Sequence, residues 1–404
     1  MSELPNSWRV IPLGDFATVQ GGSQPPKKVF IFESKQGYVR LLQIRDFGKK
    51  PVPTYVPQNR VTKFCEKDDI LIARYGASLG RIVTGMEGAY NVALAKVIAD
   101  PDVIERRYLF YMLQTQTFQT PLKMISRSAQ NGFNTGEIYP ICFPIAPLSE
   151  QRRIVARIEE LFSRLDAGVA ALRYAKAQLQ RYRQSVLSAA VTGQLTQAWR
   201  EKADVTLSEW ESVSIDDISE VKTGKTPKRG EPQFWTNGTI PWLTSSATSN
   251  DFTHEADQFV TKAALDSGLK LFEPGTLLLA MYGEGKTRGQ VTEITFQASC
   301  NQACAAIIVN DARAFRPFVK LRLQECYEQT RKAASGGNQP NLNLTKVREI
   351  PLQLPPLAEQ HQIVAEVEAR TTAIDRLEAE LDRQITRSNR LRQSTLAAAF
   401  RNSL

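Results

Sequence analysis

The sequence lacks the apolar runs that membrane insertion requires. No stretch of hydrophobic residues approaches the roughly 20 residues that span a bilayer, although 42% of the 404 residues are hydrophobic. The N-terminal segment, MSELPNSWRV, has no basic region followed by an apolar stretch, as a secretory signal would have. We therefore expect a soluble, cytoplasmic protein, in keeping with its 23% of charged residues.

Cysteine and histidine are also scarce. Five cysteines cannot all pair, and their positions show none of the even spacing of a secreted disulfide framework. Cys300 and Cys304 are close in sequence, but there is no second close pair, and His254 and His361 are the only histidines that could complete a four-ligand zinc site. We expect reduced, structural cysteines and no bound metal.

Motifs that carry catalysis are missing as well. No Asn/Asp-Pro-Pro-Tyr/Phe tetrapeptide, the loop with which amino-methyltransferases hold an extruded adenine, occurs in the chain. The tripeptide GKT at residues 224–226 and 285–287 resembles the end of a phosphate-binding loop, but the first glycine of that loop is absent in both. A Glu-x-Lys pattern at residues 33–35 and 284–286 is too short to indicate a nuclease. The sequence predicts a chain that is not an enzyme and binds no cofactor itself.

The chain does carry a positive charge, concentrated in its first half. Of the net charge of +9, residues 1–147 contribute +6 and residues 148–199 contribute +4, whereas residues 200–355 contribute −1. A surplus of lysine and arginine favours phosphate binding through the release of counterions, although many basic proteins never bind nucleic acid. Charge alone leaves DNA binding open, and the length predicts two or three domains.

One unit occurs twice in the chain. Residues 147–195 align without a gap on residues 356–404, and 19 of the 49 positions are identical. PLSEQRRIVA in the first copy matches PLAEQHQIVA in the second, and RYRQSVLSAA matches RLRQSTLAAA. The preceding segments repeat more loosely, and matched positions include Trp8 with Trp210, Gly22 with Gly224, Ala73-Arg74-Tyr75-Gly76 with Ala280-Met281-Tyr282-Gly283, and Asn91 with Asn301. Each half is thus a variable domain followed by a repeated element.

Each repeated element has the heptad pattern of a long helix. Apolar side chains recur at alternating spacings of four and three, which predicts a coiled-coil seam. The first helix starts after Pro147 and ends near Gly193, so it spans about 44 residues, or roughly 65 Å at 1.5 Å per residue. The seam residues that we expect are Ile154, Ile158, Leu161, Leu165, Leu172 and Leu179 in the first copy, and Ile363, Val367, Ile374, Leu377, Leu381 and Leu391 in the second.

Two such helices in one chain can pair with each other. An antiparallel pair fits best, because a domain of roughly 150 residues separates the two helices. This arrangement would relate the halves by an approximate two-fold axis. The alternative is two independent amphipathic helices, each covering its own domain.

The remaining segments predict domains of mixed α and β structure. DDILIARYG and GTLLLAMYG have the pattern of buried strands that end at a glycine, whereas RRYLFYMLQTQTFQT and RPFVKLRLQECYEQT have helical periodicity. We predict an α+β fold with an internal repeat. Its parts are an N-terminal domain over residues 1–147, a first helix over 148–199, a C-terminal domain over 200–355 and a second helix over 356–404.

The order of these parts resembles the specificity subunit of type I restriction-modification enzymes over essentially the entire chain. The motifs that carry the resemblance are PLSEQRRIVARIE and PLAEQHQIVAEVE at the helix starts, RYRQSVLSAAVTGQLTQAWR at the end of the first helix, and QPNLNLTKVREIPLQLPPLAEQ before the second. The resemblance implies that the variable domains are target recognition domains, which together recognise a bipartite, asymmetric DNA target. It also implies that the paired helices are a spacer that holds partner subunits.

The same resemblance implies the partners and their cofactors. We expect double-stranded DNA, two modification subunits that bind S-adenosylmethionine and methylate adenine, and restriction subunits with ATP- and magnesium-dependent translocase and nuclease activity. The chain itself would recognise sequence and position the extruded base, without chemistry.

Loops that close the strands are the expected DNA-reading segments, because polar and basic side chains there can reach base edges in the major groove. The candidates are Lys27, Lys28, Arg40, Gln43, Arg45, Arg74, Tyr75, Ser78, Arg81, Gln130 and Asn131 in the first domain, and Lys225, Thr226, Lys228, Arg229, Thr244, Ser245, Ser246, Tyr282, Lys286, Arg288, Asn338, Gln339 and Asn341 in the second. A solvated charge or a turn-forming residue is the alternative for each. Capping of the turn before each long helix is a further alternative for Gln130, Asn134, Gln339 and Asn343.

Two other functions remain open from the sequence. A coiled-coil scaffold, or a DNA-binding protein without restriction-modification partners, would also have paired helices and a duplication, although the diverged loops argue against a scaffold. A nuclease or methyltransferase that acts alone would need the motifs that are missing.

Overall fold

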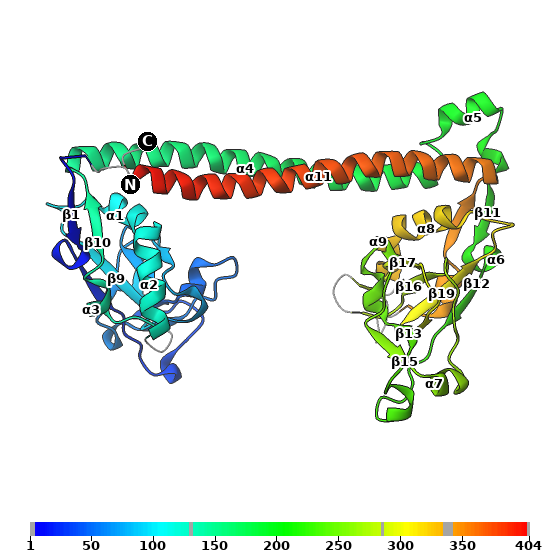
Figure 1. Ribbon diagram of the computed structural model, residues 1–404, viewed down its shortest axis with the longest axis horizontal. Coiled ribbons are helices and arrows are strands. Elements are labelled where there is room, and N and C mark those ends of the chain that lie inside the picture. Colours follow the sequence, from blue (N-terminus) through cyan, green and yellow to red (C-terminus); the bar gives the residue numbers. More distant parts are fainter. Residues whose placement is uncertain (1–4, 129–131, 284–286, 334–341, 402–404) are drawn as a thin grey trace. The chain divides into compact units, whose positions relative to one another are not determined.

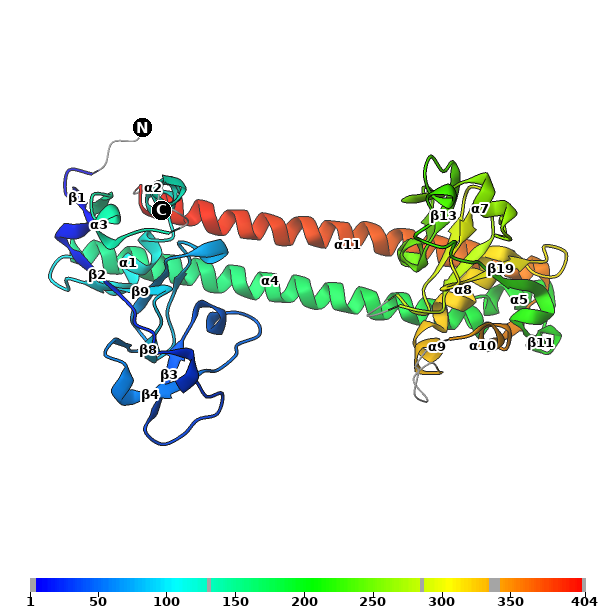
Figure 2. The same cartoon turned by 90° about the horizontal axis from the view of Figure 1, so that it is seen from below.

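The chain divides into two compact units in the computed structural model, which describes residues 5–128, 132–283, 287–333 and 342–401. The first unit comprises residues 1–173 with 382–404, and the second comprises residues 174–381. Each unit combines one variable domain with parts of two long helices (Figures 1 and 2). Within the described residues, no helix is long and apolar enough to cross a membrane.

In its described residues, the domain of the first unit contains two four-stranded sheets and a separate strand pair. The antiparallel sheet has the order β2 (Ala17–Gly21), β9 (Leu94–Ala99), β6 (Ile70–Ala73) and β7 (Ile82–Val83). The mixed sheet has the order β4 (Tyr55–Pro57), β3 (Tyr38–Leu42), β8 (Gly88–Tyr90) and β5 (Phe64–Cys65). β1 (Arg9–Pro12) pairs with β10 (Cys142–Ile145). All four residues of β6 are buried, as expected from DDILIARYG.

Short helices complete this domain. The α-helices are α1 (Arg106–Met112), α2 (Gln116–Ser128) and α3 (Thr135–Ile138). The 3-10 turns are η1 (Leu13–Asp15), η2 (Lys27–Val29), η3 (Ile44–Phe47), η4 (Gln58–Arg60) and η5 (Gly76–Ser78). Glu105 is the N-cap of α1: its carboxylate accepts a 2.7 Å hydrogen bond from the backbone N–H of Tyr108.

The domain of the second unit repeats this plan. Its larger sheet has the order β12 (Ser219–Thr223), β19 (Cys304–Val309), β16 (Leu277–Ala280), β17 (Val291–Ile294) and β14 (Phe252–Thr253). Its smaller sheet has the order β15 (Gln258–Val260), β13 (Ile240–Leu243) and β18 (Ser299–Cys300). β11 (Glu211–Ser214) pairs with β20 (Pro351–Leu354), as β1 pairs with β10 in the first unit.

The helices of the second domain are short as well. They are α5 (Gln197–Ala203), α6 (Ile215–Ile218), α7 (Lys262–Asp266), α8 (Arg316–Glu325), α9 (Tyr327–Ala333) and α10 (Leu344–Arg348). The 3-10 turns are η6 (Leu207–Glu209), η7 (Pro232–Phe234) and η8 (Ser245–Ser249).

The repeated elements form the helices α4 (Leu148–Val191) and α11 (Leu357–Ala399), which are 44 and 43 residues long. Each unit contains the start of one helix and the end of the other, so the two helices run antiparallel within it. Arg392 pairs with Asp166 at 2.6 Å in the first unit, and Arg183 pairs with Asp375 in the second. The fold predicted from the sequence, two mixed domains joined by a packed pair of long helices, is confirmed.

Each domain core is completed by the last turns of the helix that belongs to the other half of the sequence. In the first unit, Leu396 and Phe400 are buried among residues of the N-terminal domain, and the rings of Phe400 and Tyr108 lie 4.9 Å apart edge to face. In the second unit, Val186 and Ala190 are buried in the cluster that contains the domain core. Burial of this apolar area stabilises the domain and the helix end together.

The seam between the helices follows a slightly different register from the expected one. In α11 the inward positions are those of Ile374, Glu378, Leu381, Ile385, Ser388, Arg392 and Thr395, and all are buried or half-buried. Leu377 and Leu391 are 53% and 50% exposed, so the sequence placed these two residues in the seam wrongly. Each lies one residue, or about 100° of helix rotation, before an inward position.

The other expected seam residues face inward to different degrees. Those that are buried are Ile154, Ile158, Ile363, Val367 and Ile374, and those that are half-buried are Leu161, Leu165, Leu172, Leu179 and Leu381. Most of the fully buried ones lie near the start of each helix, where a domain packs against it. The other expected seam residues further along each helix are half-buried, apart from Ile374, which is 2% exposed.

Candidate nucleic-acid interface

The two domains each begin a polar loop at an equivalent glycine. A Cβ atom on Gly22 would lie 2.1 Å from the carbonyl oxygen of Asn91, and one on Gly224 would lie 1.8 Å from that of Cys300. Only glycine permits two backbones to approach so closely. In the first domain this loop leads into η2, where the side chains of Lys27 and Lys28 are exposed.

The corresponding loop of the second domain is held by side-chain contacts. The Lys225 ammonium donates to the carbonyl oxygen of Ser267 at 3.2 Å, and the Thr226 hydroxyl donates to the side chain of Gln302 at 2.5 Å. Lys228 forms an exposed ion pair with Glu231 at 3.0 Å. These three candidates present polar groups in a more restrained arrangement than the pair of lysines in the first domain.

Arg229 is the most firmly oriented exposed cation of this loop. Its guanidinium lies 4.2 Å from the ring centre of Trp235 and 4.9 Å from that of Trp242. It also donates to the side-chain oxygen of Gln258 at 2.7 Å. Stacking on two indole rings orients the guanidinium and leaves further N–H donors for a ligand.

The candidates within and directly after β3 surround a buried carboxylate. Asp46 accepts a 2.7 Å hydrogen bond from the backbone N–H of Gln43 and pairs with Arg40 at 3.5 Å. The side chains of Gln43 and Arg45 both donate to the hydroxyl of Thr54 at 3.2 Å. Part of the donor capacity of these three candidates therefore stabilises the loop, and Arg45 alone among them is exposed.

The loop after β6 carries an arginine that stacks on two rings. Arg74 lies 5.1 Å from the ring centre of Tyr75 and 6.0 Å from that of Phe133, and it donates to the carbonyl oxygen of Phe133 at 3.4 Å. Tyr75 is 46% exposed. Ser78 ends η5 and is half-buried, and the exposed Arg81 donates to the carbonyl oxygen of Phe47.

Thr244 is the N-cap of η8, and Ser245 and Ser246 are its first residues. Thr244 and Ser246 line a polar cavity, whereas Ser245 does not. The hydroxyl groups of Thr244 and Ser246 lie 2.7 Å apart in a hydrogen bond. The cavity has a volume of about 260 Å³, and its lining includes Trp242 and Gln258, which also contact Arg229. Polar donors and acceptors are therefore concentrated around Arg229.

The remaining candidates lie after β16 or outside the described residues. Tyr282 is 37% exposed, and Arg288 is half-buried and donates to the carbonyl oxygen of Gly283 at 3.4 Å. The candidates outside the described residues are Gln130, Asn131, Lys286, Asn338, Gln339 and Asn341.

Two asparagines that the sequence singled out cap helices. Asn134 is the N-cap of α3, where its backbone N–H donates to the Glu137 carboxylate at 2.6 Å. Asn343 is the N-cap of α10, where its side chain accepts from the backbone N–H of Lys346 at 2.8 Å. The capping alternative thus describes the contacts of these two residues, although each caps a short helix and not the turn before a long one.

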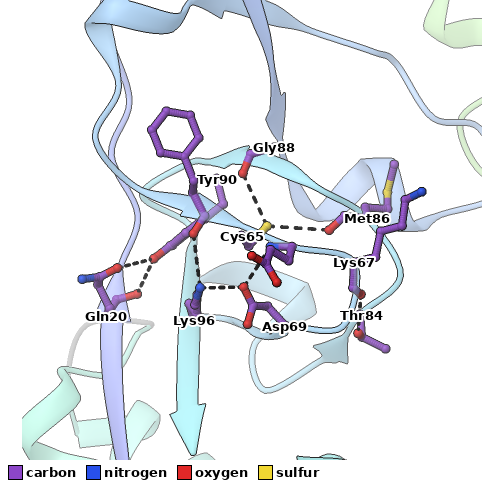
Figure 3. A network of polar contacts seen from close by, with 11 residues as sticks. Gln20, Cys65, Lys67, Asp69, Thr84, Met86, Gly88, Tyr90 and Lys96 are labelled. Atoms are coloured by element: carbon purple, nitrogen blue, oxygen red, sulfur yellow. Dashed lines mark hydrogen bonds and ion pairs between the residues drawn. The ribbon is translucent and has the colours of Figure 1, made fainter.

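A buried polar network that the sequence did not indicate links the two sheets of the first domain (Figure 3). The Lys96 ammonium pairs with Asp69 at 2.5 Å, and their side chains are 18% and 12% exposed. The thiol of Cys65 donates to the carbonyl oxygen of Gly88 at 3.5 Å. Burial, reinforced by the charge of Asp69, raises the pKa of Cys65 to about 11, so the thiol stays protonated.

A second role that the sequence did not assign belongs to the Glu-Gln pair of the PLSEQ and PLAEQ motifs. Gln151 accepts a 2.7 Å hydrogen bond from the backbone N–H of Glu105, and Gln360 accepts one of 2.7 Å from that of Phe315. Each glutamine therefore joins the start of a long helix to the start of α1 or α8. The identity of the two motifs was the available signal, because an invariant pair in a diverged repeat indicates a shared contact.

The preceding glutamates bind tryptophans in both units. Glu359 is fully buried and accepts from Trp210 Nε1 at 2.8 Å, from Thr196 Oγ1 at 2.7 Å and from Arg200 at 2.5 Å. Glu150 accepts from Trp8 Nε1 at 3.2 Å, and its side chain is 18% exposed. The helix starts are thus anchored by equivalent residues, with the denser polar cluster in the second unit.

A comparison with protein families decides what these domains are. The family model described as Type I restriction modification DNA specificity domain matches residues 5–170 and 207–387, one match for each half. The chain belongs to this family. It is a DNA specificity subunit of a type I restriction-modification system and is itself non-catalytic, so the prediction of a DNA-reading chain that is not an enzyme is confirmed.

Full-length relatives support the assignment of this specificity subunit. The chain is 24% identical over 427 residues to the Type I restriction enzyme StySPI specificity subunit of Salmonella potsdam, covering 100% of this chain and 90% of that one. It is 23% identical over 431 residues to the EcoKI specificity subunit of Escherichia coli K12, with the same two coverages.

Solved structures share the fold. A chain from a structure described as the structural basis of complex assembly and conformational transition of the type I R-M system has a TM-score of 0.78, with 20% identity and 100% of both chains covered. The HsdS subunit of Thermoanaerobacter tengcongensis has a TM-score of 0.59 and 20% identity, and the match covers 100% of this chain and 98% of that one. Within the described residues, no group of three or more His, Cys, Asp or Glu side chains is arranged to hold a metal ion.

Proposed function

We propose that the two domains of this specificity subunit bind the two halves of a bipartite, asymmetric DNA target. The observation that carries the proposal is the difference between loops at equivalent places of one repeated fold. Arg74 in the first domain corresponds to Met281 in the second, and the exposed lysines of η2 correspond to a loop in which Arg229 stacks on two indoles. Different donors at equivalent places would recognise different bases.

The proposed DNA contacts are the candidates that the structure leaves accessible, with the half-buried ones orienting them. The exposed members are Lys27, Lys28, Arg45, Tyr75, Arg81, Lys225, Lys228, Arg229, Ser246 and Tyr282. The lysines would bind phosphates, and the stacked or bidentate arginines would contact base edges. Residues 1–147 and 200–355 are the proposed recognition domains, and residues 148–199 and 356–404 are the proposed spacers.

The spacing of the two half-sites would be fixed by the helices. Their sequences repeat without a gap, which supports a constant distance between two readers on one face of the duplex. We expect half-sites about one helical turn, or roughly 34 Å, apart. Bases between them would then matter by number more than by identity, since one added base pair rotates one half-site by about 35° relative to the other.

The partners proposed for the subunit are two modification subunits and the restriction subunits of its system. Exposed apolar side chains at equivalent helix positions, Tyr182 at 46% and Leu391 at 50%, support two similar docking surfaces. S-adenosylmethionine, ATP and magnesium would be bound by these partners. The expected cytoplasmic location belongs to the same proposal, because the DNA target lies there.

The test of the two-reader proposal replaces one domain by a copy of the other. Residues 1–147 are exchanged for a second copy of residues 203–355, fused in register to the first helix, and the methylated motif is determined by sequencing methylated bases in cells that carry the whole system. We expect a symmetric motif made of two inverted copies of the C-terminal half-site, because both readers would then be identical.

Two results would contradict the proposal. An unchanged motif would show that the N-terminal domain does not read DNA, and the loss of a single base of specificity would show that the domains do not read separate half-sites. A scaffold without sequence preference predicts the first of these results, so the same experiment distinguishes it.

A further inference from the structure

A cavity of about 290 Å³ lies between α8, α11 and the end of α4 in the second unit. Its lining combines apolar side chains, among them Leu321 of α8 and Val367 of α11, with the hydroxyl of Thr371 and with charged side chains. One of these is Lys320, whose ammonium lies 3.5 Å from the ring centre of Phe252. The cavity is separate from the candidate DNA-reading loops, because none of the candidate residues lines it. Figure 1 shows α8 beside the part of α11 that belongs to this unit.

In the first unit the equivalent place is filled by side chains. Arg107 of α1 binds Glu159 of α4 through two nitrogen atoms, at 2.9 and 2.6 Å. The Tyr111 hydroxyl donates to the same carboxylate at 3.4 Å, and the ring of Tyr111 lies 5.7 Å from that of Phe162, edge to face. Arg392 covers the outer face of Phe162 at 4.0 Å. The first unit therefore closes this junction with two rings and two guanidinium groups.

The repeat defines which residues of the second unit correspond to these. Gln151 of α4 binds the backbone of Glu105 at the start of α1, and Gln360 of α11 binds that of Phe315 at the start of α8. These equivalent contacts align α1 with α8 and α4 with α11. The filling residues Arg107, Tyr111 and Phe162 then correspond to Pro317, Leu321 and Thr371, and all three of these line the cavity. The cavity is thus the space that one ring and one cation from α1, and one ring from α4, occupy in the first unit.

The carboxylate at the mouth of the cavity has also lost its partner. Glu368 corresponds to Glu159 and is exposed, and no hydrogen bond or ion pair of its carboxylate is found among the described residues. The three other acids of the lining have partners: Asp375 pairs with Arg183, Glu293 pairs with Arg316, and Asp251 accepts a 3.0 Å hydrogen bond from the side chain of Gln324. A ligand that fits would bring a positive charge to Glu368.

We propose that this cavity takes an aromatic side chain accompanied by a cation, supplied by one modification subunit. The ring would lie against Leu321 and Thr371, and the cation would pair with Glu368, as Tyr111 and Arg107 do in the first unit. This inference rests on the proposed function, since it names how one partner docks. Because the first unit fills its own cavity, the two partner copies bind unequally despite the repeat.

The first test uses tyramine, which carries both a phenol ring and an ammonium group. We expect the full chain to bind tyramine with a Kd on the order of 1 mM. The variant Thr371→Phe fills the cavity and should weaken binding at least about tenfold. The matched control is Thr372→Phe, which adds the same ring to an exposed neighbouring position of α11 and should leave binding unchanged.

Two further arms keep this test decisive. Leu321→Tyr fills the cavity from α8 and replaces Thr371→Phe if that variant does not fold. The anion 3-(4-hydroxyphenyl)propionate has the same phenol ring and should bind at least about fivefold more weakly than tyramine, because Glu368 repels it. The inference is wrong if the parent chain does not bind tyramine. It is also wrong if Thr371→Phe and Leu321→Tyr bind tyramine as tightly as Thr372→Phe does.

The second test uses the modification subunit in native mass spectrometry. The parent chain and Thr372→Phe should bind two copies, whereas Thr371→Phe should bind one copy normally and the second at least about tenfold more weakly. DNA binding by the isolated chain should be equal in all three, because none of the candidate DNA-reading residues lines the cavity. A parent chain that binds fewer than two copies contradicts the proposed function, whereas two copies bound equally by Thr371→Phe contradict the inference alone.

Discussion

At the position where the first domain pairs Lys96 with Asp69, the second domain has Ala306 and Thr276. The strand registers establish the match, because Lys96 lies opposite Leu71 of β6 and Ala306 lies opposite Leu278 of β16. Tyr90 likewise corresponds to Cys300, because Tyr90 lies opposite Leu42 of β3 and Cys300 lies opposite the equivalent Leu243 of β13 in the parallel pairing. In the second domain this region is an apolar cluster.

The comparison shows that the fold tolerates either chemistry between its sheets. An ion pair in a poorly hydrated place is costly to desolvate, and an apolar cluster of similar volume stabilises a fold at least as well. The polar network of Lys96 and Asp69 is therefore a property of the first domain and not a requirement of the architecture. Recognition domains that share this plan can differ inside as well as in their loops.

The largest expected difference between the halves lies at the helix starts. Glu359→Ala leaves Arg200, Trp210 and Thr196 without their buried acceptor, and we expect it to destabilise the second unit by about 4 kcal/mol. Glu150→Ala, its matched counterpart, removes one 3.2 Å hydrogen bond at a partly exposed site and should cost about 1 kcal/mol.

Hydrogen exchange with mass spectrometry of the full chain measures this pair of variants, because its peptides report on each unit separately. Protection should fall in the second unit for Glu359→Ala and only slightly in the first unit for Glu150→Ala. Equal losses would show that the denser cluster around Glu359 adds nothing.

An intermediate effect is expected for the ion pair inside the first domain. Asp69→Ala leaves the Lys96 ammonium without its charged partner and the backbone N–H of Glu66 without an acceptor, so the first unit should lose about 3 kcal/mol. The double variant Asp69→Thr with Lys96→Ala introduces the residues of the second domain and should recover to within about 1 kcal/mol of the parent. Urea unfolding, monitored by hydrogen exchange of peptides from the first unit, measures the stability of both variants. A double variant that is no more stable than Asp69→Ala would show that the residues of the second domain cannot replace this ion pair.

The smallest expected effect concerns the two equivalent ion pairs between the helices. Arg183→Ala removes an exposed pair with Asp375 and a longer one, of 3.7 Å, with Glu378, and should cost about 0.5 kcal/mol. Arg392→Ala also removes the stacking on Phe162 and should cost about 1 kcal/mol. In a Phe162→Leu background, Arg183→Ala and Arg392→Ala should lower the urea midpoint by the same amount. A difference that persists would show that stacking on Phe162 is not its cause.

The sequence predicted the long helices well because their information is local. The heptad spacing and the proline at each start define α4 and α11 without any knowledge of the domains. The slip at Leu377 and Leu391 has the same origin. An apolar residue such as leucine is assigned to the seam when only sequence spacing is used. The inward position beside Leu391 is instead that of Arg392, which faces the partner helix because Asp166 neutralises its charge there.

The internal contacts of the domains could not be predicted in this way. Lys96 and Asp69 are 27 residues apart in sequence, and Glu359 meets Trp210 across 149 residues. Such pairs depend on strand order and domain packing, which spacing does not determine. The candidate loops were chosen by composition, so the sequence could not tell that Gln43 would bind Thr54 inside the fold or that Arg229 would stack on two indoles.

The burial of Phe400 beside Tyr108 has a consequence for how the protein is made at the ribosome. Residues 174–381 contain everything that the second unit needs, whereas the first unit needs residues 382–404 as well. We therefore expect the domain that is synthesised first to finish folding last. Until the final turns of α11 emerge, its apolar surface stays uncovered, and a chain that stops short of those turns would carry that surface into the cell.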